Sequence, residues 1–351
     1  MLGTEVVLHD LKLLLQRHFS DGLVTIVGSG LSCAEGLPGM GELADHLCQA
    51  IGTSLKDDEI ARWREILPLL KEIGLEAALL SKPPGPALEA EIVTETAKII
   101  AKREKEVITE VFLGVRTLRL TGLLRHIIKP AHGIPIITTN YDRLVEIAVE
   151  EAGLGVDTMF VGRLAGKLNE KESRLSFCRD VSLKKNRISY HYQTRVIVYK
   201  PHGSLDWYAR NGQPVHYSGD LVGIARLIIT PGKNKFRNGY DSPFDHHRSR
   251  ANDAIDRGSR FLILGYGFND DHLETHLLPA IRGGKPALLI TYKLSSTAEA
   301  LANECGNVIA LEKASENGVD GTRAIVNRVE SFIPNKNLWD VQSFIKEVLE
   351  P

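Results

Sequence analysis

Short apolar runs recur along the chain, and most of them end at Gly, Pro or Asn. Because these runs are rich in β-branched residues, they are typical of strands that are covered on both faces of a parallel sheet. The predicted strands are Leu23–Val27, Pro135–Thr139, Val196–Tyr199, Leu227–Thr230, Phe261–Leu264, Ala287–Thr291 and Val308–Leu311. Helical patterns intervene at Gly41–Ile51, Asp142–Glu151, Asp270–Ile281 and Thr297–Cys305. This alternation predicts an α/β fold with a doubly wound, mostly parallel, Rossmann-like sheet.

Two insertions and a tail interrupt the alternation. Residues 53–129 are rich in Leu, Ile, Glu and Lys, and predict a helical insertion or lid that breaks at the prolines of 82–86. Residues 162–195 are basic and poor in apolar residues, which favours a solvated loop or helical face over a patch for a partner or nucleic acid. We therefore expect a catalytic domain over 1–313 and a C-terminal helical segment over 314–351, which packs on the core or on another subunit.

Composition and charge narrow the class of protein. The 351 residues are 43% hydrophobic, which is enough for a substantial core. Lys and Arg number 43 against 44 Asp and Glu, so no overall field points to nucleic acid or to an anionic membrane. No apolar run is long enough to span a bilayer. Leucines at helical spacing among the charged residues of 1–20 predict an amphipathic helix and not a signal peptide.

The cysteines are scattered and form no C-x-x-C pair. They stand at Cys33, Cys48, Cys178 and Cys305. This spacing argues against a disulfide framework and against a four-cysteine zinc site, so we expect no metal and no zinc ribbon. A reducing, cytoplasmic location is the expectation.

A glycine-rich turn follows the first predicted strand. Gly28 and Gly30, with Gly36 six residues further on, would let the backbone approach a pyrophosphate, and N–H groups at the next helix start would bind the anion. The spacing departs from the usual G-x-G-x-x-G, because Ser32 and Cys33 stand where the third glycine belongs. On its own, this turn is equally consistent with nucleotide binding and with a simple tight turn.

Polar residues also follow three later strands. Thr138–Asp142 ends the second strand with more polar groups than one helix cap requires. His202 stands beside Gly203, which would leave room for a substrate to approach the imidazole. Gly265–Asp270 adds two glycines that would admit a ribose or adenosine, and Asn269 or Asp270 could hold ribose hydroxyls or cap the next helix. Because the carboxyl ends of parallel strands meet at one edge, we expect all four turns to enclose one ligand.

These turns, in this order, resemble the sirtuin-like superfamily. The matching motifs are Gly28–Ser32, Gly36–Pro38, Thr138–Asp142, His202–Gly203 and Gly265–Gly267. The family's Asp-Phe-Arg after the proline is absent, because Gly39-Met40-Gly41 stands there, and so are its paired zinc cysteines. The spellings Thr-Thr-Asn-Tyr-Asp, His-Gly-Ser-Leu-Asp-Trp and Gly-Tyr-Gly-Phe-Asn-Asp look like prokaryotic sirtuin-like effectors of anti-phage defence.

The resemblance implies a function and a site. It implies an enzyme that hydrolyses NAD to nicotinamide and ADP-ribose, with Asn140 orienting water or ribose hydroxyls, His202 as general base and Asp142 steadying the site. Residues that would contact NAD are Gly28, Ser29, Gly30, Ser32, Thr139, Gly203, Gly265, Tyr266, Gly267 and Asn269. It also implies a homo-oligomer and a defence partner such as a HerA-like ATPase or an Argonaute. A zinc-free deacylase or ADP-ribosyltransferase, and a sensor that binds NAD or ADP-ribose without cleaving it, are the alternatives. Nucleic-acid binding by the basic insertion stays open as an accessory role.

Overall fold

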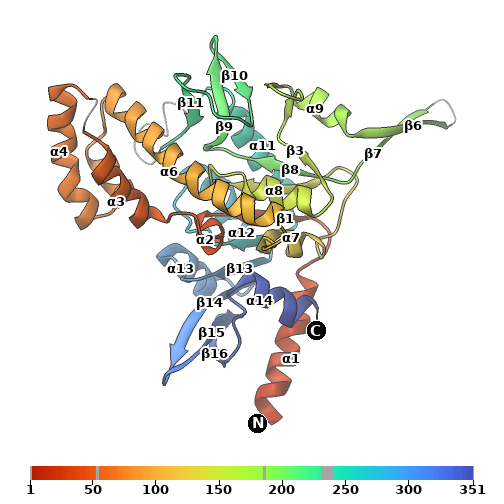
Figure 1. The fold of residues 1–351 in the computed structure, drawn as a ribbon. Coiled ribbons are helices and arrows are strands. Elements are labelled where there is room, and N and C mark those ends of the chain that lie inside the picture. The colour runs from red at the N-terminus through yellow and green to blue at the C-terminus, as the bar shows by residue number, and fades with distance from the viewer. Residues whose placement is uncertain (1, 53–54, 185–186, 231–240, 351) are drawn as a thin grey trace.

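A nine-stranded main sheet organises the molecule (Figure 1). The computed structural model describes residues 2–52, 55–184, 187–230 and 241–350, and the strand counts refer to these residues. The strand order is β16-β15-β14-β13-β12-β1-β2-β8-β3, and all neighbouring pairs are parallel except β14 with β15 and β15 with β16. The bounds are β1 (Leu23–Val27), β2 (Ile134–Thr138), β3 (Gly155–Asp157), β8 (Arg195–Tyr199), β12 (Arg260–Leu264), β13 (Ala287–Thr291), β14 (Val308–Glu316), β15 (Val319–Val326) and β16 (Val329–Pro334). The predicted α/β class with a mostly parallel sheet is confirmed.

Helices cover both faces of this sheet. Their bounds are α1 (Leu2–Arg17), α2 (Ser29–Ala34), α6 (Pro86–Phe112), α7 (Arg119–Leu124), α8 (Leu144–Glu151), α11 (Phe244–Arg257), α12 (Asp271–Arg282), α13 (Ser296–Glu304) and α14 (Val341–Phe344). α6, α7, α8 and α14 pack on one face, and α11, α12 and α13 on the other. Leu23 and Val27 of β1 enter the first core, while Val24 and Ile26 enter the second, since successive side chains of a strand point to opposite faces. Within the described residues, no helix combines the length and apolarity that crossing a membrane requires.

The segment predicted as a helical insertion has a small core of its own. It contains α4 (Asp57–Glu72), α5 (Leu75–Ser81), the long α6 and α7, preceded by α3 (Met40–Ala50). Trp63, Ile66, Leu79 and Leu88 are buried between α3, α4, α5 and α6, away from the main sheet. The helical structure is interrupted between α5 and α6. α6 starts with Pro86, where the missing N–H costs no hydrogen bond.

A second sheet of five strands lies beside the main one, in the order β11-β9-β10-β5-β4. Its strands are β4 (Phe160–Val161), β5 (Gly166–Leu168), β9 (Gly203–Arg210), β10 (Gln213–His216) and β11 (Arg226–Ile228). The basic insertion was expected to be a loop or a helical face. It forms β5, the short α9 (Glu170–Ser176) and a hairpin of β6 (Cys178–Lys184) and β7 (Arg187–Tyr192), which projects from the body in Figure 1. Cross-strand pairing, which composition does not reveal, accounts for the difference.

One predicted strand is placed in the wrong sheet. Leu227–Thr230 was expected in the parallel sheet, but β11 pairs antiparallel with β9 at the edge of the second sheet. A four-residue apolar run has no period that separates these two environments. The structure also adds β3, a three-residue strand whose Gly155 and Asp157 give no apolar signal.

The tail over 314–351 was expected to be helical, and for most of its length this is wrong. β14, β15 and β16 form an antiparallel meander, and helix starts only at Val341. Asn317 and Gly318, both at positive φ, turn β14 into β15, and Asn-Gly is a strong two-residue hairpin signal. The amphipathic pattern at the end does form α14 and the π-helical turn Ile345–Leu349, which pack on the first core.

Candidate active site

The four polar turns meet in one cleft at the carboxyl edge of the main sheet. The cleft has a volume of about 180 Å³ and receives residues from the turns after β1, β2, β8 and β12. Of the predicted site residues, those lining it are Ser29, Ser32, Thr139, Asn140, Asp142, His202, Tyr266, Gly267 and Asn269. The amide of Asn140 and the imidazole of His202 therefore face the same cavity, although 62 positions separate them in the sequence.

A buried chain of hydrogen bonds fixes the Asn140 amide. Its Nδ2 donates to the Gly28 carbonyl oxygen at 2.9 Å and to Ser32 Oγ at 2.8 Å. Ser32 Oγ in turn donates to Asp142 Oδ2 at 2.8 Å. Both hydrogens of Nδ2 are thus used, which leaves Oδ1 as the part of this amide that can accept from a ligand. The orientation of the amide is set by contacts with residues on both sides of the β1 turn.

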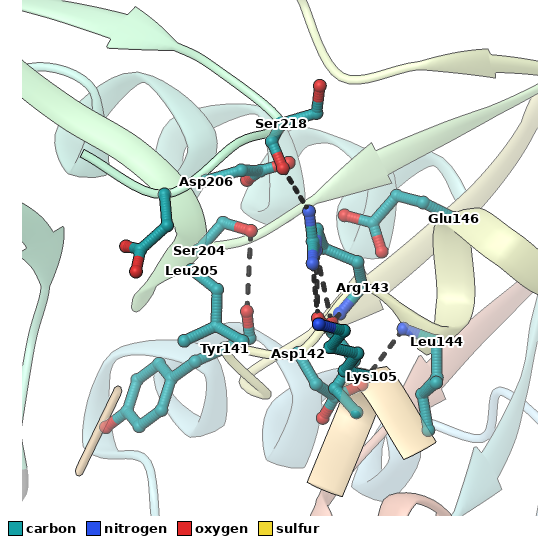
Figure 2. A network of polar contacts seen from close by, with 12 residues as sticks. Lys105, Tyr141, Asp142, Arg143, Leu144, Glu146, Ser204, Leu205, Asp206 and Ser218 are labelled. Atoms are coloured by element: carbon teal, nitrogen blue, oxygen red, sulfur yellow. Dashed lines mark hydrogen bonds and ion pairs between the residues drawn. The ribbon is translucent and has the colours of Figure 1, made fainter. Parts of the chain in front are cut away.

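The Asp142 carboxylate also accepts a hydrogen bond from the backbone. Its Oδ1 accepts the backbone N–H of Leu144 at 3.1 Å, as Figure 2 shows, so this carboxylate caps the start of α8. Burial raises the pKa of Asp142, and the nearby Lys200 and the Ser32 hydroxyl oppose that shift. The Lys200 ammonium is fully buried and donates to the Asp142 carbonyl oxygen at 2.5 Å and to Glu146 Oε1 at 3.0 Å. Because Asp142 is fixed by these contacts, its carboxylate positions the Ser32 hydroxyl and, through it, the Asn140 amide.

The turn is also tied to α6. Arg143 pairs with the fully buried Glu104 of α6. It also donates to the Ser218 carbonyl oxygen at 2.9 Å (Figure 2). The Tyr141 carbonyl oxygen accepts a hydrogen bond from Ser204 in β9. The strand exit that carries Asn140 is therefore anchored to both neighbouring layers.

His202 has a partner that the sequence reasoning did not assign to it. Its Nε2 lies 2.5 Å from Asp270 Oδ2, and the two side chains are 11% and 4% exposed. Asp270 Oδ1 accepts the N–H groups of His272 and Leu273, so the same carboxylate caps α12. Because Nε2 lies against the Asp270 carboxylate, Nδ1 is the ring nitrogen that stays open to another group. An Asp at a predicted helix start was the available signal, but it indicated only a cap or a ribose contact.

The glycine turns pack on each other. A Cβ on Gly28 would lie 2.4 Å from the Gly265 carbonyl oxygen, and one on Gly30 would lie 2.8 Å from Gly265 Cα. The N–H of Gly28 donates to the Leu264 carbonyl oxygen and that of Gly30 to the Gly265 carbonyl oxygen, both at 2.9 Å. These two N–H groups are thus occupied, and the glycines allow the ends of β1 and β12 to approach closely.

Gly203 was expected to clear the way to His202, but the structure gives it another role. Its φ is +89°, and a Cβ there would lie 2.1 Å from the Leu227 carbonyl oxygen. The glycine is therefore required where β9 passes β11, and it does not line the cleft.

The helical region supplies one wall of the cleft. Met40 and Leu43 of α3, Glu76 of α5 and Ile100 of α6 all line it. The sequence predicted a helical insertion or lid but none of its residues as part of the site, because nothing local shows that its helices fold over the carboxyl edge. Within the described residues, no group of three or more His, Cys, Asp or Glu side chains is arranged to hold a metal ion.

A second cavity lies on the β13 side of the glycine turns. It has a volume of about 410 Å³ and is lined by Gly30, Cys33 and Gly265, with Tyr292 after β13 and Trp339 from the tail. Strands β2 and β8 lie on one side of β1, and β12 to β14 lie on the other. The chain order thus reverses next to β1, and in open α/β sheets ligands bind at such a reversal.

Several solved structures are similar to this chain. A sirtuin structure described as the structural basis for substrate affinity is 13% identical, with 97% of each chain covered and a TM-score of 0.41. Sir2Tm bound to a propionylated peptide is 13% identical, with 97% of each chain covered and a TM-score of 0.45. No protein of curated function matches the sequence. Residues 135–306, which carry the turns after β2, β8 and β12, match the family model of the SIR2-like domain, and this match implies NAD binding.

Proposed function

We propose that this protein is an NAD glycohydrolase, which cleaves the bond between nicotinamide and ribose and releases nicotinamide and ADP-ribose. The observation that carries the proposal is the shared cleft of Asn140 and His202, each locked by partners of its own. An oriented amide oxygen and an oriented imidazole at one sheet edge suit a reaction that needs a placed nucleophile and little acid catalysis.

NAD would lie across the reversal of chain order next to β1. The smaller cleft has the size for the nicotinamide and its ribose, and the larger cavity near Tyr292 has room for the adenosine. The pyrophosphate would then cross the glycine turns, beside the side chain of Ser29. Because the N–H groups of Gly28 and Gly30 are occupied, we expect hydroxyls and other N–H groups to bind the phosphate oxygens.

The chemistry follows from the leaving group. The nicotinamide nitrogen of NAD is cationic, so it takes the electron pair of the breaking C–N bond without being protonated. The ribose carbon becomes cationic in the transition state, and Asn140 Oδ1 would stabilise it or hold the attacking water. His202 Nδ1 would accept the proton that water loses as it forms the new C–O bond, and Asp270 would stabilise the imidazolium. Water and NAD thus give nicotinamide, ADP-ribose and a proton.

Hydrolysis is favoured over acyl transfer by the wall from the helical region. Met40, Leu43 and Glu76 line this cleft, and a bulky acceptor would need a channel past them to reach the ribose. Water needs no such channel. A deacylase or ADP-ribosyltransferase would instead consume NAD only when an acyl peptide or an acceptor side chain is supplied.

The biological role is proposed from the sequence resemblance alone. We propose that the protein depletes NAD as an effector of anti-phage defence, as a homo-oligomer and with a partner such as a HerA-like ATPase. An enzyme that consumes NAD needs an off-state, so a partner or a trigger would control it.

The test is product analysis with purified protein and NAD. We expect nicotinamide and ADP-ribose to appear in equal amounts without an acceptor, alone or with the neighbouring gene's product. Asn140→Ala and His202→Ala should each lower nicotinamide release about 100-fold or more. Each variant should stay folded, with a Tm lowered only by the loss of the buried contacts of that side chain. Full activity in both variants refutes the site, and NAD binding without products would identify a sensor.

A further inference from the structure

A separate cavity opens at the opposite edge of the main sheet. It has a volume of about 370 Å³ and lies where β1, β2 and β8 begin, so that Leu23, Ile134 and Arg195 all line it. A five-residue strand is roughly 16 Å long at about 3.3 Å per residue, which separates this cavity from the cleft of Asn140. Its volume lies within the roughly 300–1,000 Å³ of small-molecule sites.

Arg195, which lines this cavity, has one guanidinium nitrogen without a hydrogen-bond acceptor among the described residues. It is 2% exposed, and its guanidinium carbon lies 5.1 Å from the ring centre of Tyr192 and 5.8 Å from that of Phe177. Nε donates to Asp157 Oδ2 at 3.2 Å and Nη2 to the His132 carbonyl oxygen at 3.1 Å. Nη1 is buried and has no acceptor within the part of the chain that the structure describes. A buried donor in this state costs free energy until an acceptor arrives.

A second arginine at the cavity has no carboxylate partner in the described part of the chain. Arg174 of α9 lines the cavity and forms no ion pair within the described residues. The neighbouring Arg250, by contrast, pairs with Glu170 at 2.8 Å and with Asp253 at 2.9 Å. These two carboxylates of the cavity are therefore already engaged, and Asp21 is the third carboxylate of the lining. Arg174 supplies the unpaired positive charge, while Arg195, whose charge is paired with Asp157, adds the free donor Nη1.

The remaining lining is largely apolar or aromatic. Ile128, Ile134, Ile197 and Tyr199 form much of it. A ligand that suits this cavity has one group of anionic oxygens for the arginines and a compact body that can rest on an apolar surface. Guanidinium groups bind phosphate and carboxylate oxygens with charge-assisted hydrogen bonds.

We propose that this cavity is a second ligand site, which binds a small molecule that carries one phosphate or carboxylate group on a compact, partly apolar body. The anionic group contacts Arg174 and Arg195, and the body lies against the starts of β2 and β8. The site does not depend on NAD cleavage, because none of its residues lines the carboxyl-edge cavities.

The probes are AMP, benzoate, inorganic phosphate and adenosine, titrated into the full chain by calorimetry. AMP or benzoate should bind, phosphate more weakly, and adenosine at least tenfold more weakly than AMP, because it lacks the anionic group. The charge contribution should also make the affinity fall with added salt.

Arg174→Gln is the informative variant, since its exposed side chain forms no ion pair that the fold needs. It should weaken the binding of the anionic probe about tenfold, the size expected for one charge-assisted contact. Lys171→Gln, on the same helix but outside the cavity, is the matched control and should leave the affinity unchanged. Because Arg174 is remote from the carboxyl edge, AMP bound there instead would be equally tight in both variants. That outcome, or equal affinity for AMP and adenosine, overturns the proposal.

Discussion

Replacement of Asp270 by Asn separates the role of its charge from its role in the fold. Asn accepts the same two N–H groups at the start of α12, and Asn and Asp cap helices about equally well. The loss of the charge at the helix start costs on the order of 0.5 kcal/mol, so the variant should stay folded. What disappears is the negative charge 2.5 Å from His202 Nε2.

The size of the effect follows from the charge that forms on His202. Two unit charges about 4 Å apart interact by about 4 kcal/mol at an effective dielectric constant of about 20. The imidazolium is only partly formed in the transition state, so roughly half of this interaction, about 2 kcal/mol, is lost from catalysis. That loss corresponds to about a 30-fold lower kcat.

The assay is nicotinamide release under saturating NAD, together with Tm as the measure of folding. Asp271→Asn is the matched control, because Asp271 is exposed, stands one residue further along and forms no ion pair with His202. It should retain full activity. If Asp270→Asn keeps kcat within about threefold of the parent while the parent is active, the His202–Asp270 pair plays no part in proton transfer.

Two further predictions concern stability. Gly203→Ala should lower the free energy of unfolding by roughly 2–4 kcal/mol in urea titrations, because a Cβ would clash with a carbonyl at a positive φ; an unchanged midpoint would contradict this. The second concerns Asp206 and His216, whose Oδ2 and Nε2 lie 2.9 Å apart. Burial alone would raise the pKa of Asp206 and lower the pKa of His216. The interaction between the two side chains reverses both shifts: it lowers the pKa of Asp206 to about 2 and raises the pKa of His216. The contribution of the ionised Asp206 to the free energy of unfolding is present above pH 3.8 and is lost as the pH falls towards 2. The contribution of the protonated His216 is present below pH 6.5 and is lost as the pH rises above that value. His216→Gln should therefore destabilise by about 1–2 kcal/mol between these limits and less outside them, and a pH-independent difference would refute the pairing.

Sequence patterns were sufficient for most of the parallel part of the sheet and for the meeting of the four polar turns at one edge. Buried parallel strands are continuous apolar runs, so six of the seven predicted strands fall in the main sheet. Polar residues such as Asn140 and His202 follow these runs directly, and parallel strands bring their carboxyl ends to one edge. The errors lie where the pattern is short or its turn signal was not used, as at Leu227 and at Asn317–Gly318.

The amino-acid sequence by itself determined the buried core strands, the helices that follow four of them and the polar residues at each strand exit, because those follow from local periodicity and chain connectivity. Only the tertiary structure decided which side chains meet: Asp270 with His202, Ser32 with Asn140, and the helical region with the cleft. Contacts of this kind join segments about 70 to 110 positions apart, and the packing of whole layers sets them. The cavity that Arg195 lines arises in the same way, since no local pattern shows where three strand starts leave room between them.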